Sequence, residues 1–141
     1  MRYNKILKGD NLSYLHGTEL INLKAEISYL MSLFDEFGAS EIELPSLLDA
    51  SVLVDVYGED IRNRVYSAFD SFGNKKILRP DFTVPIVQTH IASGSSVGKY
   101  SYSGLVWRSQ PSGGKKPSEY YQAGLEYFHE VVLYFHSTFQ L

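Results

Sequence analysis

The chain has 141 residues, a formal net charge of −3, 44% hydrophobic residues and no cysteine. This length suits one domain or a piece of one, and the composition predicts a soluble globular core, since no window approaches 18 consecutive apolar residues. Disulfides are excluded, a large nucleic-acid surface is disfavoured by the lack of a basic run, and a start without an apolar stretch predicts a cytoplasmic protein with no membrane contact.

A long amphipathic helix is predicted near the start. Thr18 is placed to cap a helix over about residues 19–37, and Gly38 can end it in a left-handed conformation. The apolar residues recur at alternating spacings of three and four, and we interpret them as core or dimer interface: Leu20, Leu23, Ile27, Leu30, Phe34 and Phe37.

Short elements are predicted next. Residues 41–45 alternate polar and apolar and end at a proline, which predicts a short strand. Residues 65–69 and 75–79 flank a Gly-Asn turn and predict a hairpin. Thr83 is placed to cap a helix of about two turns that has Pro85 in its first turn.

Two long strands, residues 99–108 and 119–128, are predicted to pair antiparallel across a loop rich in Gly, Lys and Pro. Alternation places on one surface Tyr102, Gly104, Val106 and Arg108 from the first strand, with Gln122, Gly124 and Glu126 from the second. Because glycine lets a ligand approach the backbone closely, this face is interpreted as a small-molecule site.

Structural explanations compete with this one. Arg108 and Glu126 can instead form a cross-strand ion pair, and Lys115 and Lys116 can be a solvated loop tip in place of a contact for an anionic group. The segment from Leu78 to Asp81 alone is typical of a strand end and turn. The four histidines lack ligand spacing, so no metal site is predicted.

The order of these motifs is more specific than any one of them. A long helix, Leu-Arg-Pro-Asp-Phe-Thr83, a strand ending in Arg108 and Gln122-Ala-Gly-Leu-Glu126 together resemble the class II aminoacyl-tRNA synthetase core in its histidyl branch, over about residues 15–128. The resemblance implies an α+β fold with an antiparallel sheet flanked by helices, of which only the N-terminal half is present. We therefore expect a partial domain over 1–128 and an atypical hydrophobic tail over 129–141, the product of truncation or a frame shift that exposes a sheet edge.

The resemblance also implies a histidine site. Asp81 and Thr83 would hold the amino group of histidine, and Gln122 and Glu126 would complete that pocket. Arg108 matches the arginine that bridges the amino-acid carboxylate and the ATP α-phosphate in the synthetase, a role that suits a guanidinium fork.

Departures from the synthetase pattern favour a paralogue. This chain has Asp81 where synthetases have Glu, Gln110 where they have Glu, and Lys116 near the position of an arginine that grips the γ-phosphate, so ATP activation is weakened. The pattern resembles the regulatory subunit of ATP phosphoribosyltransferase, which implies a non-catalytic protein without a cofactor that senses histidine, pairs with a short-form catalytic subunit and forms a homodimer through residues 19–45. A histidyl-tRNA synthetase fragment that activates histidine with ATP and a stand-alone dimerisation or binding module remain the alternatives.

Overall fold

The computed structural model describes residues 15–52, 57–111, 117–129 and 135–140, the last of these by its backbone. The elements in chain order are α1 (Gly17–Glu36), β1 (Ser40–Glu41), β2 (Leu47–Asp49), α3 (Glu59–Arg62), β3 (Ser67–Phe69), β4 (Lys75–Leu78), α4 (Thr83–Ser93), β5 (Gly98–Trp107), β6 (Glu119–Phe128) and β7 (Phe135–Gln140). They form a four-stranded sheet in the order β1-β5-β6-β7 and a three-stranded sheet in the order β2-β4-β3. The predicted α+β architecture is confirmed.

The long strands β5 and β6 pair as predicted. They are antiparallel over their full lengths, with Tyr102 opposite Gly124 and Gly104 opposite Gln122. Directly opposed residues project from the same face of a sheet, so the predicted common surface is confirmed for its members within the two strands, while Arg108 follows the end of β5. The short β1 lies parallel to β5 and begins before the predicted strand, which it covers only at Glu41.

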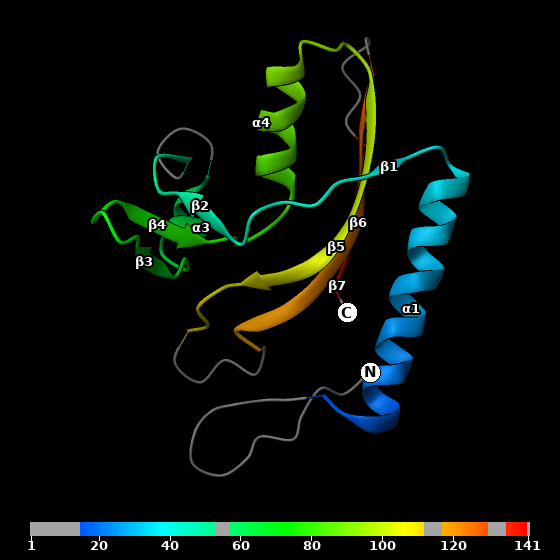
Figure 1. Ribbon diagram of the computed structural model, residues 1–141, viewed down its shortest axis with the longest axis horizontal. Helices are drawn as coiled ribbons and strands as arrows, with labels where there is room; N and C mark the ends of the chain where they lie inside the picture. Colours follow the sequence, from blue (N-terminus) through cyan, green and yellow to red (C-terminus); the bar gives the residue numbers. More distant parts are fainter. Residues whose placement is uncertain (1–14, 53–56, 112–116, 130–134, 141) are drawn as a thin grey trace.

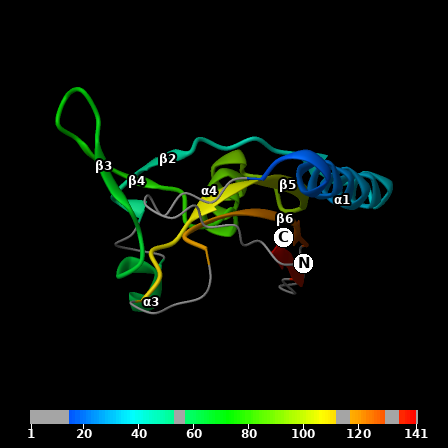
Figure 2. The same cartoon turned by 90° about the horizontal axis from the view of Figure 1, so that it is seen from below.

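The two faces of the large sheet carry different helices. Figures 1 and 2 show α4 on one side of β5 and β6 and α1 on the other. The face beneath α4 belongs to a buried apolar cluster made of Leu44, Phe82, Ile86, Tyr102, Val106 and Phe128. On the opposite face, the Lys99 ammonium lies 4.2 Å from the centre of the Phe37 ring and donates to the Phe37 carbonyl oxygen over 3.0 Å.

Helix α1 differs from its prediction at the N-terminus and agrees with it at the C-terminus. His16 precedes it without a side-chain cap, and Thr18 lies inside its first turn, so the predicted Thr18 cap is wrong. At the other end Gly38 has φ +82° and its N–H donates to the carbonyl oxygen of Asp35, as predicted for a left-handed terminus. Of the predicted stripe, Leu23 and Phe34 are buried.

Helix α4 is longer than predicted and is capped differently. It spans 11 residues, about three turns at 3.6 residues per turn, and ends at Gly94, which has φ +69°. Pro85 lies buried in the first turn as predicted. The residue before the helix is Phe82, and the Thr83 hydroxyl donates to Glu126 across the molecule, so the predicted Thr83 cap is wrong.

The small sheet lies beyond the end of β5 and contains the predicted hairpin (Figure 2). Its turn is closed by Asp70, whose Oδ1 accepts N–H groups of Phe72 and Asn74 at 2.9 Å each. The Asn74 side-chain amide adds a third bond, and these bonds lower the pKa of the Asp70 carboxyl. The unpredicted β2 pairs with the other side of β4.

The C-terminal segment adds a strand where we expected an atypical tail. Residues 135–140 pair antiparallel with β6, with Leu125 opposite Ser137 and Glu126 opposite His136. The sequence predicted one exposed edge of the sheet without naming the strand, and in the structure β7 pairs with β6 along part of its length. The division at residue 128 stays a prediction. In the described part of the chain no helix has the length and apolarity needed to span a bilayer.

Candidate functional site

The predicted site residues meet around the turn between β4 and α4. That turn is buried from Arg79 to Phe82, and it directs Asp81 and Thr83 toward opposite neighbours. One oxygen of Asp81, Oδ1, accepts the Tyr57 hydroxyl at 3.0 Å and the Val84 N–H at 3.3 Å. The carboxylate is thus held by the start of α4 and by a tyrosine that precedes α3.

Glu126 joins the turn to the large sheet. Its Oε1 accepts the Thr83 hydroxyl at 2.8 Å and the Tyr102 hydroxyl at 3.4 Å. The residue is 6% exposed, so the carboxylate lies out of bulk water. A buried carboxylate is stable only with hydrogen-bond or charge partners, and these two hydroxyls supply part of that requirement.

Gln122 is the most deeply buried of the five predicted histidine-binding residues, at 3% exposed. It lies on β6 opposite Gly104 and on the same face as Glu126. Its side-chain Oε1 has no hydrogen-bond partner among the described residues. An unmatched buried amide oxygen costs free energy, so this position is suited to a donor supplied from outside the described residues.

Arg108 comes directly after β5 and contacts the same turn. Its Nε donates to the Pro80 carbonyl oxygen over 2.8 Å. Arg108 and Glu126 are not opposed in the sheet, because Glu126 lies opposite Tyr100 and Arg108 follows the last residue of β5. The register therefore does not support the directly opposed cross-strand ion pair that the sequence left open.

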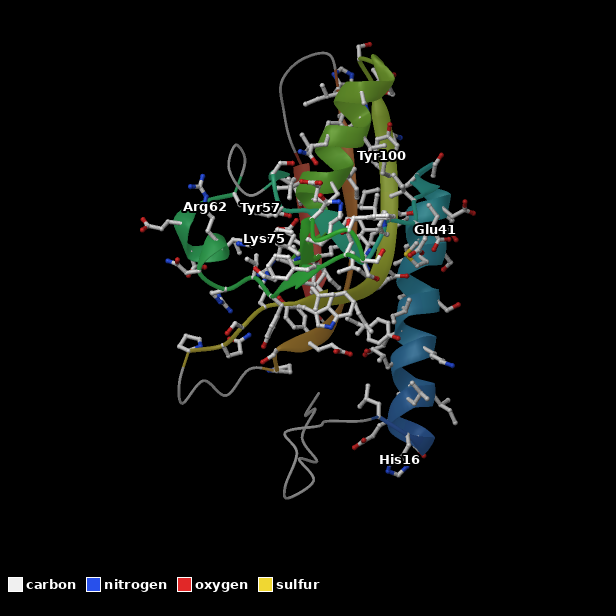
Figure 3. The ribbon with its side chains drawn as sticks, turned by 60° about the vertical axis from the view of Figure 1, so that its left-hand side comes forward. His16, Glu41, Tyr57, Arg62, Lys75 and Tyr100 are labelled. Atoms are coloured by element: carbon white, nitrogen blue, oxygen red, sulfur yellow. The ribbon has the colours of Figure 1, made fainter. Side chains whose placement is uncertain are left out.

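Tyr57 is a site residue that sequence reasoning missed. Its burial among the apolar residues beside the small sheet raises the pKa of its hydroxyl strongly above the usual 10.0, the Asp81 carboxylate raises it further, and the Arg108 guanidinium opposes both. The phenol is therefore protonated at neutral pH, as its hydrogen bond to Asp81 requires. Figure 3 labels Tyr57 and Arg62, whose Nε donates to the Tyr57 carbonyl oxygen over 2.8 Å. A single tyrosine gives no sequence signal of this kind.

Tyr120 and Arg64 extend the cluster toward the end of β5. Burial raises the pKa of the Tyr120 hydroxyl, while the guanidinium groups of Arg108 and Arg64 lower it and Asp81 raises it. Two arginines and one carboxylate thus act on the same half-buried phenol. The family resemblance implied that Arg108 and Asp81 belong to one pocket, but nothing in the sequence indicated a position for Arg64.

The side-chain amide of Gln110 forms hydrogen bonds within the chain. Its Oε1 accepts Nη2 of Arg64 at 3.1 Å, and its Nε2 donates to the Pro117 carbonyl oxygen at 3.0 Å. Both ends of the amide are used to close the base of the loop between β5 and β6. Lys115 and Lys116, predicted as phosphate contacts, lie outside the described residues.

The site is built from oxygen acceptors and guanidinium groups. Among the described residues, no group of three His, Asp or Glu side chains could hold a metal ion. His90 forms a hydrogen bond through Nδ1 with the Tyr100 hydroxyl over 3.0 Å and stacks on the Phe128 ring at 4.0 Å. This histidine belongs to the packing of α4 on the sheet.

Comparison with known proteins identifies the family. The family model described as histidyl-tRNA synthetase matches residues 18–132. The chain belongs to the histidyl-tRNA synthetase family. Among curated relatives, the ATP phosphoribosyltransferase regulatory subunit of Rhizobium etli is 37% identical over 108 residues, covering 76% of this chain and 28% of the relative. The one from Agrobacterium fabrum is 38% identical over 98 residues, covering 67% of this chain and 25% of the relative.

Solved structures of the family confirm the fold. A structure titled as an ATP phosphoribosyltransferase regulatory subunit/histidyl-tRNA synthetase from Bacillus halodurans has a TM-score of 0.61 and 29% identity, covering 77% of this chain and 29% of that one. A structure titled as a histidine–tRNA ligase subunit from Alicyclobacillus acidocaldarius has a TM-score of 0.69 and 17% identity, covering 90% of this chain and 37% of that one. The predicted class II synthetase-like core is confirmed, and this chain spans between a quarter and two fifths of the length of the proteins it matches.

Proposed function

We propose that this chain is part of a non-catalytic regulatory subunit of ATP phosphoribosyltransferase, which acts in the first step of histidine biosynthesis, and that it binds histidine for feedback control. The names of the curated relatives support the subunit assignment. A short-form catalytic subunit is the proposed protein partner. The proposed histidine-binding residues are Asp81, Thr83, Arg108, Gln122 and Glu126.

The unmatched oxygen of Gln122 is the observation that carries histidine binding. Asp81, Gln122 and Glu126 are three buried residues with acceptor oxygens. An α-ammonium group has three N–H donors and a positive charge, so it would supply the donor that Gln122 lacks while remaining near carboxylates. Arg108, anchored to the same turn, would bind the ligand's carboxylate.

The engagement of Gln110 supports a role without aminoacylation. Its amide is already bonded to Arg64 and Pro117, so a nucleotide base would have to displace these partners. The amino-acid part of the site has no such competitor at the Gln122 oxygen among the described residues. We therefore propose that histidine is bound without ATP and is not activated.

A histidyl-tRNA synthetase fragment is the second candidate, favoured by the description of the family model. It requires an ATP site, for which Arg108 is the matching residue. Pyrophosphate exchange that depends on both histidine and ATP would establish this candidate and contradict the non-catalytic proposal.

Calorimetric titration of the purified chain with histidine tests the proposal directly. Circular dichroism first establishes that the chain is folded at the temperature of the titration. Saturable binding of one histidine per chain, unchanged by added ATP, is the expected result. A folded chain that shows no heat of binding at millimolar histidine would overturn histidine sensing by this segment.

Glu126→Ala is expected to weaken histidine binding. The substitution removes a buried carboxylate proposed to pair with the ammonium, and a hydrogen bond to a charged group contributes about 1.5–3 kcal/mol, or roughly tenfold to a hundredfold in Kd. Glu119→Ala is the matched control, because Glu119 lies exposed on the same strand and bonds to Trp107 Nε1 at 2.8 Å. Equal affinities of the Glu126 variant and the wild type would show that the ligand binds elsewhere.

A further inference from the structure

A short segment from Tyr57 to Arg64 touches two separate parts of the candidate site. At its first residue, the Tyr57 hydroxyl donates to Asp81 Oδ1 over 3.0 Å. At its last residue, Arg64 bonds to Ser109 in both directions: the Ser109 N–H donates to the Arg64 carbonyl oxygen over 2.7 Å, and Arg64 Nε donates to the Ser109 carbonyl oxygen over 3.0 Å. One segment therefore contacts the turn after β4 and the end of β5.

The segment is closed by its own hydrogen bonds. It contains the single turn α3, and the Arg62 N–H donates to the Gly58 carbonyl oxygen over 3.1 Å while its side-chain Nε donates to the Tyr57 carbonyl oxygen over 2.8 Å. Tyr57 is also anchored in the apolar cluster with Ile77. A segment held in this way moves as one piece, because displacing one end breaks several bonds together.

The Arg64 end meets the base of the loop that joins β5 to β6. Arg64 Nη2 donates to Gln110 Oε1 over 3.1 Å, and Gln110 Nε2 reaches the Pro117 carbonyl oxygen over 3.0 Å. The Arg108 N–H donates to the Ser118 carbonyl oxygen over 2.8 Å. Residues 108–110 and 117–118, the loop base, are therefore held together partly through Arg64.

We propose that Tyr57 is a positioning residue for Asp81, and that the segment 57–64 couples the state of this carboxylate to the loop base. This inference rests on the proposed function for its ligand, since Asp81 is assigned to the histidine ammonium. When a cation binds Asp81, the Tyr57 bond changes and the change is transmitted to Ser109 and Gln110. Amino-acid binding would thereby alter the hydrogen bonds at the end of the site that carries Arg108.

Hydrogen exchange on the full chain tests the coupling without any ligand. Tyr57→Phe removes the hydroxyl and keeps the ring in the apolar cluster. We expect exchange of the Ser109 amide, bonded to Arg64, to accelerate about fivefold relative to the Ile42 amide, the effect of one net hydrogen bond. Conversely, Arg64→Ala should accelerate the Val84 amide, which donates to Asp81.

The outcomes separate coupling from local damage. Acceleration of Val84 alone in Tyr57→Phe, or an equal rise at all amides including Ile42, would overturn the proposal, because the first is a local effect and the second a loss of global stability. If Tyr57→Phe does not fold, the Arg64→Ala measurement decides. Asp60→Ala is the matched control, since it removes only an exposed 3.4 Å ion pair with Arg64, and both amides should keep their rates.

A ligand measurement distinguishes this inference from the proposed function. If wild type binds histidine, Arg64→Ala should weaken binding about fivefold although its side chain contacts residues 109 and 110 and not Asp81. The double variant with Tyr57→Phe should lose less than the product of the single effects, since the two act through one segment. If the loss of affinity in the double variant equals the product of the two single losses, the coupling is contradicted. If wild type fails to bind histidine, the proposed function fails and the exchange rates still decide the coupling.

Discussion

Arg79 is a buried cation that is held by main-chain oxygens. The residue is 3% exposed, its Nη1 donates to the Pro45 carbonyl oxygen at 3.2 Å and its Nη2 to that of Leu105 at 2.9 Å. The guanidinium carbon lies 4.0 Å from the centre of the Phe82 ring. Burial lowers the pKa of Arg79, and Glu43 opposes this shift. The side chain thus connects the segment before β2, the end of β5 and the turn that carries Asp81.

Arg79→Lys should therefore destabilise the fold despite conserving charge. A lysine has one nitrogen and cannot satisfy carbonyl groups in two directions, so we expect a loss of about 2–4 kcal/mol in the free energy of unfolding. Urea denaturation followed by circular dichroism measures it. Arg62→Lys is the control at an exposed position, where a loss below about 1 kcal/mol is expected. Equal losses in the two variants would contradict the role given to Arg79.

For single residues, the sequence predicted which side chains share the site better than it predicted their hydrogen-bond partners. Alternation in two strands placed Gln122 and Glu126 on one face because side-chain direction has a strict period of two. It could not predict that Thr83 bonds to Glu126 and does not cap its helix, because a hydroxyl can do either and only the tertiary arrangement decides. Tyr57 gave no pattern at all, since its contact with Asp81 spans 24 residues of chain.

Helix α1 leaves part of its apolar surface uncovered in the described part of the chain. Its inward stripe packs on the sheet through buried Leu23 and Phe34, while Ile21 is 66% and Tyr29 65% exposed. Exposed apolar groups on one helix are typical of a protein contact. We propose that residues 19–45 form the homodimer contact that the family resemblance predicted.

Ile21→Lys is expected to shift the chain toward monomer. A charge placed at the centre of an apolar contact must be desolvated for the dimer to form, which weakens association by roughly tenfold or more. Sedimentation velocity over a concentration series measures the shift. Lys75→Glu changes charge at an exposed position outside residues 19–45 and serves as the control. A wild-type chain that stays monomeric at all concentrations would contradict the dimer.

Elements with a long hydrophobic period or a turn signal were predicted, and short elements with neither were missed. The helix 17–36 and the pair 98–107 with 119–128 follow from periods of 3.6 and 2, and the hairpin around Gly73 follows from its turn residues. The strand β2 and the single turn α3 contain three and four residues, too few for a period to be visible. β2 is held by its pairing with β4, which is distant in the sequence, and α3 is held by the local hydrogen bond that Arg62 donates. Hydrophobic periodicity records neither contact.

At the scale of the whole molecule, the site lies where two sheets meet. The turn from Arg79 to Thr83 connects the last strand of the small sheet to the helix that covers the large one, so its position depends on both (Figure 1). The Trp107 N–H donates to the Arg79 carbonyl oxygen over 3.0 Å and links the sheets directly. The sequence predicted both sheets in part but not this junction.

The last strand is expected to protect the large sheet from self-association. β7 pairs with β6 from Gln122 to Tyr127, the stretch that carries Gln122 and Glu126. Removing residues 135–141 would leave that row of backbone groups unpaired, and an unpaired edge strand is a template for pairing with another chain. We expect the shortened chain to form species heavier than those of the full chain, increasing with concentration, when mass is followed by light scattering. If the shortened chain retains both the mass and the thermal midpoint of the full chain, β7 contributes neither edge protection nor stability, and the pairing in this structure does not persist in solution.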